Sequence, residues 1–347
     1  MRRTLKLCDH ENLSTPPPLN VSVEDLPLYT RHQSRPLENV FLQELDDVFA
    51  LGCGLLADSG GQLLPQSLNP STTKFPNASL ARRTRLDVGL TRLVTPRIPE
   101  ALWITDRSCG NYYHWLLEAL LRLFLARRAG ITAPLLLPNI VNKRPFALRS
   151  LEAMGETNPI ITGRRVGRRV ERFLVPEHPS QREHKTLTYS REALSMFAGS
   201  IRKRLAVDAA PRQKIYASRP PGLRRIIVDE APIIEYMRQC GYRIVRMEDF
   251  DFAGQVELLA GASHFVTLHG AALSNMIFMP PGGRVMEIAH RSLIFHDFWK
   301  LAHAMSLDYY VCLGMPASDG TGADPHFGNV KLDLKVLRSA VAEFEKD

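Results

Sequence analysis

The second half of the chain alternates short apolar runs with amphipathic segments. Buried strands are predicted for the apolar runs at 214–218, 242–247, 264–268, 284–288 and 309–312. Apolar residues at helical spacing predict helices over 229–240, 252–260, 271–278 and 295–306. Strands that alternate with helices through short connections are typical of a parallel, doubly wound sheet. We therefore expect a Rossmann-like half over 209–330, followed by a C-terminal helix within 331–347 that crosses back onto the first half.

The preceding part of the chain also mixes helices and strands. An apolar segment at 101–105 predicts a strand, and the pattern after it predicts a long amphipathic helix over 112–128, capped by Asn111. Shorter strands are expected at 134–138, 159–161 and 170–175, and further helices over 145–155 and 188–205. This mixture predicts an α/β half over 101–208.

The first hundred residues are less regular. Five prolines among polar residues in 14–39 predict an extended arm. The glycine-punctuated apolar run 48–57 predicts a pair of strands, and the polar composition of 58–100 predicts loops and short strands. We expect residues 1–100 to form an arm and an irregular, strand-containing region that packs on the first half.

Composition limits the classes of protein that fit. The chain has 347 residues, and 45% apolar content is enough to build a sizeable core and excludes general disorder. Lys and Arg number 44 against 36 Asp and Glu, so the net charge of +8 suits anionic partners such as nucleotides, acidic lipids or nucleic acid. Five scattered cysteines without a CxxC pair support neither a zinc ribbon nor a disulfide framework. No apolar stretch predicts a membrane span or a signal peptide, so we expect a cytoplasmic protein.

The turn after the strand at 264–268 has the features of a phosphate site. Gly270, Ala271 and Ala272 are small enough for a ligand to approach the backbone, and they open a predicted helix whose N-terminal N–H groups attract anions. His269 stands at the end of the strand and can donate to the same anion. Tight packing between the strand and the helix is the alternative explanation for the small residues.

A basic loop follows the strand at 214–218. Ser218 and Arg219 come directly after this strand, and Arg224 and Arg225 lie a few residues further on. Arginine binds phosphate oxygens in a bidentate manner and stays charged, so these residues would complement a diphosphate. Such a loop could also be merely solvated. Ligands of doubly wound sheets bind at the carboxyl ends of the strands, which favours the first interpretation.

The predicted helix over 112–128 carries a candidate general base. His114 and Glu118 are four residues apart, so they lie on one face of the helix. A carboxylate beside an imidazole raises its basicity, and the pair could deprotonate a hydroxyl group. Tyr112, Tyr113 and Trp115 could offer flat surfaces to a sugar ring. A purely structural pair is the alternative; a metal is not expected, since no third and fourth ligands are apparent.

Two further patterns favour structural roles. Asp249-Phe250-Asp251 is a DxD sequence, but one of its carboxylates is expected to cap the helix that begins at Phe252. The arginines in 164–172 alternate with apolar residues, which favours a solvated strand edge over contact with a membrane or nucleic acid. The chain contains no P-loop, no GxGxxG after a strand, no GxSxG and no HExxH. Their absence removes the common routes to an NTPase, a dinucleotide oxidoreductase, an α/β-hydrolase or a zinc protease.

An ordered set of motifs resembles glycosyltransferase family 61, whose bacterial members are often described as capsular polysaccharide biosynthesis proteins. The matching positions are the run 112–118, Tyr216 to Arg219, Arg224-Arg225, Asp229-Glu230, Gln255, the run 269–275, Pro281-Gly282 and Glu287. The chain differs from the family in Ala272, where glycine is usual, and in Asp229, where asparagine is usual. The resemblance covers about residues 100–310 and leaves the first hundred residues unassigned.

The resemblance implies an inverting glycosyltransferase of the GT-B class: two Rossmann-like halves that face each other across a cleft. The donor, a nucleotide sugar, would be held by residues of the second half: Ser218, Arg219, Arg225, His269, Gly270, Asn275 and Glu287. In the mechanism that we expect, Arg219 and Arg225 clamp the diphosphate and Glu287 accepts hydrogen bonds from the ribose or the sugar. His114, assisted by Glu118, deprotonates the acceptor, and no metal cofactor is required.

The expected acceptor is a growing surface glycan of a bacterium, either capsule, lipopolysaccharide or exopolysaccharide. A glycan that is linked to a lipid would bring this basic protein to the inner face of the cell membrane. Eukaryotic members of the family carry a membrane anchor that this sequence lacks, which favours the bacterial setting. Nucleic acid is not an expected partner. The alternative function is a non-catalytic α/β module that binds a nucleotide or a polyanion.

Overall fold

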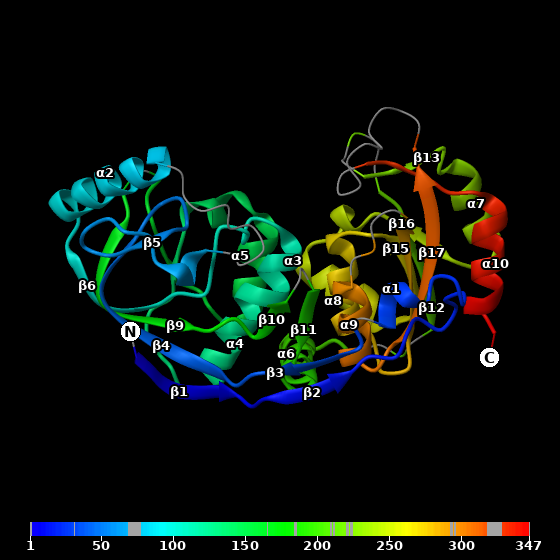
Figure 1. Cartoon of the computed structure of the whole chain (residues 1–347), viewed down its shortest axis with the longest axis horizontal. Helices are drawn as coiled ribbons and strands as arrows, with labels where there is room; N and C mark the ends of the chain where they lie inside the picture. Colours follow the sequence, from blue (N-terminus) through cyan, green and yellow to red (C-terminus); the bar gives the residue numbers. More distant parts are fainter. Residues whose placement is uncertain are drawn as a thin grey trace. The chain divides into compact units, whose positions relative to one another are not determined.

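The structure is a computed structural model with two compact units. It describes residues 2–30, 32–68, 78–164, 166–183, 186–208, 210, 212–219, 222, 225–291, 294, 296–317 and 328–346. Unit 1 consists of Met1–Glu11 and Pro36–Lys185, and unit 2 of Asn12–Arg35 and Thr186–Asp347. Each unit contains its own principal sheet and its own hydrophobic core (Figure 1).

Unit 2 is built on a seven-stranded sheet of lateral order β13-β18-β17-β16-β15-β12-β14. The strands are β12 (Gln213–Ala217), β13 (Ile227–Val228), β14 (Arg243–Val245), β15 (Ala262–Leu268), β16 (Arg284–His290), β17 (Asp308–Pro316) and β18 (Val330–Lys331). Neighbours from β14 to β17 are all parallel, and only β18 runs antiparallel to β17. The strands β14, β12, β15, β16 and β17 are neighbours in this lateral order. Numbered by their order along the chain, these five strands read 2-1-3-4-5, so the strand order reverses between β12 and β15. The doubly wound parallel sheet predicted for this half is confirmed, and its switch point lies at the ends of these two strands.

Helices cover both faces of this sheet (Figure 1). They are α6 (Arg191–Arg204), α7 (Ala231–Gln239), α8 (Phe252–Ala260), α9 (Asp297–Ala304) and α10 (Leu334–Phe344), with the 3₁₀ segments η4 (Met247–Asp249) and η5 (Ala271–Phe278). Each predicted helix of this half is present, although the segment after β15 is a 3₁₀ helix. The connections that precede the helices are short, as the sequence predicts.

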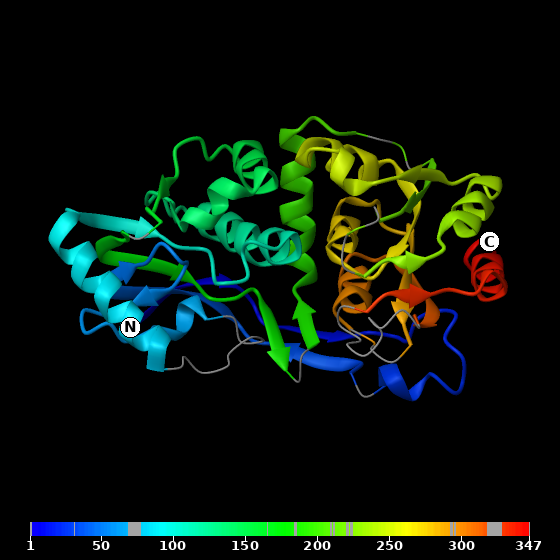
Figure 2. The same cartoon turned by 90° about the horizontal axis from the view of Figure 1, so that it is seen from above.

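The last helix packs on the sheet of its own unit. Leu337, Val341 and Phe344 of α10 belong to one buried cluster with residues of α7 and of the central strands. α7 and α10 lie side by side against this face of the sheet (Figure 1 and Figure 2). The expectation that the C-terminal helix crosses back onto the first half is therefore wrong, because its apolar stripe is used within unit 2.

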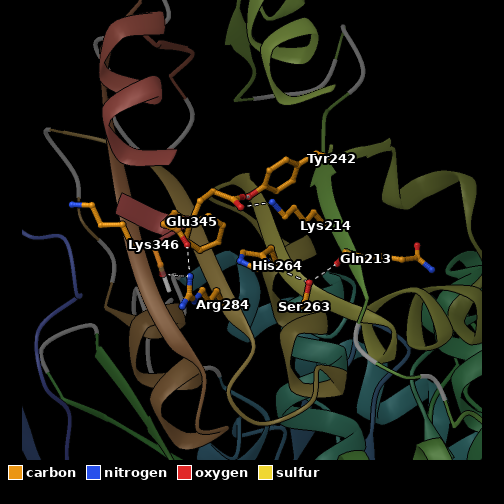
Figure 3. A network of polar contacts seen from close by, with 9 residues as sticks. Gln213, Lys214, Tyr242, Ser263, His264, Arg284, Glu345 and Lys346 are labelled. Carbon is orange, nitrogen blue, oxygen red and sulfur yellow. Dashed lines mark hydrogen bonds and ion pairs between the residues drawn. The ribbon is translucent and has the colours of Figure 1, made fainter. Parts of the chain in front are cut away.

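A polar network fastens the end of α10 to the sheet (Figure 3). Glu345 forms an ion pair with Lys214 of β12 and accepts a hydrogen bond of 2.5 Å from the hydroxyl of Tyr242. Arg284, at the start of β16, donates to the carbonyl oxygen of Phe344 at 2.9 Å. These contacts lie at the amino ends of the strands, at the opposite edge of the sheet from the switch point.

The proline-rich arm belongs to unit 2. The indole N–H of Trp299 in α9 donates to the carbonyl oxygen of Pro16 at 2.7 Å. The side chain of Asn20 forms two hydrogen bonds with the backbone of Val311 in β17: it donates to the carbonyl oxygen at 2.8 Å and accepts from the N–H at 2.9 Å. The arm also contains the short helix α1 (Pro27–Thr30). The prediction that all of residues 1–100 pack on the first half is therefore wrong for Asn12–Arg35.

The division between the units also differs from the predicted one at residue 208. α6 packs on α8 and η5 of unit 2, so the unit begins at Thr186. Four short strands lie near the points where the chain passes from one unit to the other, namely β2 (Glu11–Ser14), β3 (Ser34–Leu37), β10 (Ser180–Glu183) and β11 (Thr186–Tyr189).

Unit 1 contains a mixed sheet. Its strands are β1 (Arg2–Cys8), β4 (Val40–Ala50), β5 (Leu56–Ala57), β6 (Arg97–Leu102) and β9 (Arg168–Pro176), in the order β1-β4-β9-β6 with β5 beside β4. β4 is antiparallel to its neighbours, whereas β6 is parallel to β9, and β7 (Leu136–Leu137) is parallel to β8 (Ile160–Ile161). The strand pair predicted at 48–57 is confirmed as β4 and β5. The sheet is parallel only in part, and the GT-B arrangement stays a prediction.

The helices of unit 1 include one that the sequence pattern did not predict. α2 (Ala78–Val94) occupies a segment where loops and short strands are expected, and α5 (Pro145–Met154) lies where a helix is predicted. Short 3₁₀ segments are η1 (Pro65–Ser67) and η3 (Asn139–Lys143). The prediction for α2 is wrong because Thr84 and Thr91 stand on either side of Val88 on its buried face, so the apolar periodicity that indicates a helix is weak on that side.

The long helix of unit 1 is confirmed, with an irregularity in its first turns. It runs through α3 (Tyr112–His114), the π-helical segment η2 (Trp115–Leu120) and α4 (Leu121–Arg128). Asn111 caps it as predicted, since its side chain accepts from the N–H of Tyr113 at 2.9 Å. π-helical turns inside helices often occur at functional sites.

The arginines of β9 are paired with acidic residues of neighbouring strands. Arg169 contacts both carboxylate oxygens of Asp47 at 2.6 and 2.9 Å, and Arg172 pairs with Glu44 and Glu100. The arginines lie on a strand as predicted, but β9 has β4 and β6 on its two sides, so the prediction that it is an edge strand is wrong. Arg165 lies outside the described residues. Among the helices in the described parts of the chain, none has the length and apolar character needed to cross a bilayer.

Candidate functional site

A pocket of about 260 Å³ opens at the switch point of the sheet in unit 2. It is lined by residues at and after the ends of three parallel strands, namely Ala217 at the end of β12 with Ser218 and Arg219 after it, Met247 and Glu248 after β14, and Thr267, Ala271 and Ala272 at and after the end of β15. Four of the predicted donor-binding residues are thus brought to one cavity. Ligands of doubly wound sheets bind at this place because the loops on either side of the switch point diverge.

Arg219 is held in place by backbone carbonyl groups. Its guanidinium donates to the carbonyl oxygen of Arg225 at 2.8 Å and to that of His269 at 3.3 Å, and Arg225 donates to the same oxygen of His269 at 3.1 Å. Burial lowers the pKa of Arg219, and the carboxylates of Glu248 and Glu230 oppose this effect. The side chain therefore keeps its charge at the wall of the pocket. Arg224 lies outside the described residues.

Gly270 makes room for Arg219. Its φ of 160° is extended backbone that other residues also adopt. A Cβ atom at this position would lie 2.1 Å from Nη2 of Arg219, which is closer than any real contact. The sequence predicts that this glycine lets a ligand approach the backbone; in the structure, the space beside it is filled by the guanidinium.

His269 is oriented by a buried carboxylate. Its Nδ1 is hydrogen-bonded to Glu287 of β16, and the second oxygen of Glu287 accepts from the hydroxyl of Tyr309 in β17. Burial and the adjacent carboxylate raise the pKa of Tyr309 well above its usual value, so the phenol remains a donor. Glu287 is only 2% exposed. The structure therefore does not support the predicted direct contact of Glu287 with ribose or sugar, because both oxygens are bound inside the protein.

Asn275 is a residue of η5 that holds the elements around the pocket together through hydrogen bonds. It is fully buried, and its amide donates to the side-chain oxygen of Gln255 at 2.9 Å and to the carbonyl of Ala272 at 3.3 Å. Gln255 in turn donates to the carbonyl of Met247 at 2.9 Å. The predicted role of Asn275 as a donor ligand is thus replaced by a structural one that links η5, α8 and the loop after β14.

The candidate base lies in unit 1, on the π-helical part of the long helix. Nδ1 of His114 is 2.8 Å from Oε2 of Glu118, as the spacing predicts, and Nε2 of His178 is 3.2 Å from the same oxygen. Burial alone would raise the pKa of Glu118, but the charges and hydrogen bonds of His178 and His114 hold it well below its usual range. Glu118 is thus an ionised anchor for two imidazoles. Sequence reasoning missed His178, which follows β9 and has no local motif.

Glu118, His178 and a further acidic residue beside them could ligate a metal ion. Asp106, Glu118 and His178 place ligand atoms within 4.8 Å of one another. Arg122 stands beside them: burial lowers its pKa to about 10, while Asp106 and Glu118 stabilise its charge. Its guanidinium donates to the carbonyl oxygens of Ile104 and Pro176. The positive charge that two buried carboxylates require is therefore supplied by the protein, which disfavours a divalent cation here.

The DxD sequence has the capping role that the sequence predicts. Asp251 is the N-cap residue of α8 and accepts from the N–H of Gly254 at 2.8 Å. This bond satisfies one of the free donors at the start of the helix. Its carboxylate is thus used by the helix that it precedes.

Comparison with known proteins covers the stretch that carries both candidate groups. Residues 112–286 match the model of the family Glycosyltransferase 61. Over 86 residues the chain is 33% identical to protein O-linked-mannose beta-1,4-N-acetylglucosaminyltransferase 2 of Takifugu rubripes, a match that covers 24% of the chain and only 15% of that protein. The relative is an animal protein, so the bacterial, capsule-related setting gains no support from it. The family model spans the helix of His114, the pocket and the start of β16, and on this ground the chain belongs to glycosyltransferase family 61.

Proposed function

We propose that this glycosyltransferase moves a sugar from a nucleotide-sugar donor to a hydroxyl group of a growing glycan, with inversion at the anomeric carbon. The observation that carries the proposal is the pocket at the switch point, where a charged, fixed arginine meets two small residues at the start of η5. A diphosphate needs positive charge, N–H donors and room for its oxygens, and this pocket has the residues for all three.

The donor is assigned to unit 2. Arg219 faces the diphosphate, and the backbone N–H groups at the start of η5 supply further donors beside Ala271 and Ala272. Ser218 and Glu248 also line the pocket and suit the hydroxyl groups of a ribose. His269, oriented by Glu287, takes part through its backbone carbonyl, which holds both Arg219 and Arg225.

The base is assigned to unit 1. His114 takes the proton of the acceptor hydroxyl, and the ionised Glu118 stabilises the imidazolium that results. The acceptor oxygen then forms a bond to the anomeric carbon while the bond to the diphosphate oxygen breaks and its electron pair leaves with the diphosphate. Arg219 balances the charge that develops on the leaving group, so the reaction needs no metal ion.

The acceptor that the resemblance to bacterial members of the family implies is a surface glycan of a bacterial cell. The matched relative is named for transfer of N-acetylglucosamine to O-linked mannose. Nucleotide-linked N-acetylglucosamine is therefore the first donor to test, and a mannose-terminated glycan the first acceptor.

The test is an assay of purified protein with a panel of nucleotide sugars, in which release of the nucleoside diphosphate and the configuration of the product are followed by NMR. We expect release with one nucleotide sugar, and a product of opposite anomeric configuration when an acceptor is present. Binding of nucleotides without any transfer or hydrolysis would favour a non-catalytic module. Failure to bind any nucleoside diphosphate would refute the donor site itself.

A further inference from the structure

The outward side of α2 in unit 1 carries an apolar stripe. Leu86, Leu90 and Leu93 are spaced by four and three residues, so they lie on one face of the helix, and their exposed fractions are 66%, 41% and 84%. The buried side carries Thr84, Val88 and Thr91, which are 1%, 3% and 0% exposed, and Leu80 packs against the same cluster as Val88. A surface helix of a soluble protein normally keeps its large apolar side chains on the side toward the core, whereas α2 has a second row of them on its outward side. Leucines that remain in water at this spacing indicate a surface that another partner covers.

Arginines flank this stripe. Arg82, Arg83 and Arg85 are exposed on the first turns of α2, and Arg92 lies near its end. Asp87 is the one acidic residue of the helix, so its net charge is 4 − 1 = +3. Arg92 donates to the carbonyl of Ser59 at 2.7 Å, and Arg83 lies 3.9 Å from the carboxylate of Asp87. Arg82 and Arg85 are therefore the arginines best placed to meet an external anion.

We propose that α2 docks on the headgroup layer of an anionic lipid membrane. The three leucines would enter the boundary between headgroups and acyl chains, and the arginines would contact lipid phosphates. Helices that lie in the plane of a membrane combine these two features, a row of large apolar side chains and flanking basic residues. α2 runs along the outside of its own unit, where it contacts β9 (Figure 1). It contributes no residue to the pocket of unit 2, so this inference does not depend on the proposed function.

Other partners fit these observations less well. In a symmetric dimer through α2 the same arginines would meet each other, with only Asp87 to offset them, and like charges repel. A nucleic acid would use the arginines but leave the leucines in water. An anionic bilayer is the partner that satisfies both sets of side chains.

Vesicle flotation tests the proposal. We expect the protein to float with vesicles of equal parts phosphatidylglycerol and phosphatidylcholine, and to bind at least about tenfold less to pure phosphatidylcholine or at high salt. A variant with Leu86→Ser, Leu90→Ser and Leu93→Ser should lose about tenfold or more of the binding to anionic vesicles. A second variant, with Arg82→Gln, Arg83→Gln and Arg85→Gln, should lose a similar factor. The matched control replaces the exposed Met315 and Val336 by serine, and its binding should be unchanged.

Three results would overturn the proposal: the unaltered protein stays unbound, the leucine variant floats as well as the unaltered protein, or sedimentation shows a dimer that the leucine variant dissociates. Circular dichroism verifies that the variants fold. Because Leu93 is the most exposed of the three, Leu93→Trp provides a variant that keeps the fold, and its fluorescence should shift to the blue with anionic vesicles. Transfer to a soluble acceptor should be the same in the leucine variant, so the result is independent of the catalytic assay.

Discussion

The side chain of Glu118 accepts a hydrogen bond from His114 one helical turn away, with 2.8 Å between Oε2 and Nδ1. The carboxylate is 3% exposed, and His178 approaches the same oxygen from the end of β9. Since the pKa of Glu118 lies well below its usual range, the group is ionised at neutral pH and cannot act as a general acid. In this arrangement the carboxylate fixes the ring of His114 and stabilises its protonated form.

Replacing the base should lower turnover and spare donor binding. We expect His114→Ala to reduce kcat about 10²–10⁴-fold, because proton transfer by a positioned side chain contributes this factor. The affinity for a nucleoside diphosphate, measured by calorimetry, should be unchanged, since the proposed donor pocket is lined by residues of unit 2. Glu118→Gln keeps the shape of the side chain and removes its charge, and it should lower kcat by a smaller factor. Full turnover in His114→Ala would mean that another group takes the proton.

Removing the charge of Arg219 should, in contrast, weaken the binding of the nucleoside diphosphate. Arg219→Ala should weaken binding of a nucleoside diphosphate about 30-fold, since hydrogen bonds to charged groups contribute about 2 kcal/mol. Arg219→Lys keeps the charge but loses the two-pronged geometry, so it should recover only part of the affinity. Arg238→Ala, at an exposed position of α7, is the matched control. Equal affinities in Arg219→Ala and in the control would remove Arg219 from the donor site.

A methyl group at position 270 should displace Arg219 without unfolding the protein. Gly270→Ala introduces a Cβ where Nη2 of Arg219 now lies, while the extended backbone accepts alanine. We expect a loss of nucleotide affinity close to that of Arg219→Ala and a melting temperature within a few degrees of the original. Ala272→Gly removes an atom from the same turn and leaves Arg219 in place, so it should bind nucleotides normally. A strong loss of affinity in Ala272→Gly alone would contradict this account.

The alternation of apolar runs predicted the strands and helices of unit 2 well, because each of these elements has a pattern of apolar residues within its own short stretch of sequence. Each strand of a parallel sheet that is covered on both faces is apolar throughout, and each helix between them has one apolar side. Ser218 and Arg219 were therefore placed at a strand end, and with them the pocket. The helix of His114 was predicted for the same reason, from its cap at Asn111 and its regular apolar positions.

What the pattern missed depends on contacts between distant residues. His178 reaches Glu118 from a strand about 60 residues further along the chain, and no local spacing indicates it. The burial of Asn275 and Glu287 follows from their partners Gln255 and Tyr309, which lie 20 and 22 residues away. α2 was missed because three of its leucines face outward while threonines flank Val88 on its buried side, which weakens the usual signal.

Chelation of divalent cations should leave the transfer rate unchanged. Asp106, Glu118 and His178 have suitable ligand atoms, but Arg122 already supplies a positive charge beside the two carboxylates, and in the proposed mechanism Arg219 stabilises the diphosphate. We expect equal rates with EDTA and with added Mg²⁺ or Mn²⁺. The informative comparison is Asp106→Asn, which keeps the side-chain acceptor for the N–H of Ser108 and weakens any metal site. Loss of activity with EDTA that Mn²⁺ restores would assign a metal to this group.

The network at the end of α10 should give unit 2 a pH-dependent stability (Figure 3). Burial would raise the pKa of Glu345, but hydrogen bonds from Lys214 and Tyr242 outweigh it and lower the pKa below its usual value of 4.5. A carboxylate with a lowered pKa in the folded state stabilises it fully above the pKa of the unfolded chain, and this stability is lost as the pH falls through the folded value. Because the pair is partly open to solvent, its contribution is about 1 kcal/mol or less.

The Glu345→Gln variant should therefore melt about 2–4 °C below the unaltered protein at pH 7, and this difference in melting temperature should narrow as the pH is lowered from 4.5. Glu343→Gln, whose partner Lys346 is exposed on the same helix end, is the control and should show little change at any pH. A gap for Glu345→Gln that stays constant down to the acid limit of folding would show that packing, and not the charge, fastens the helix.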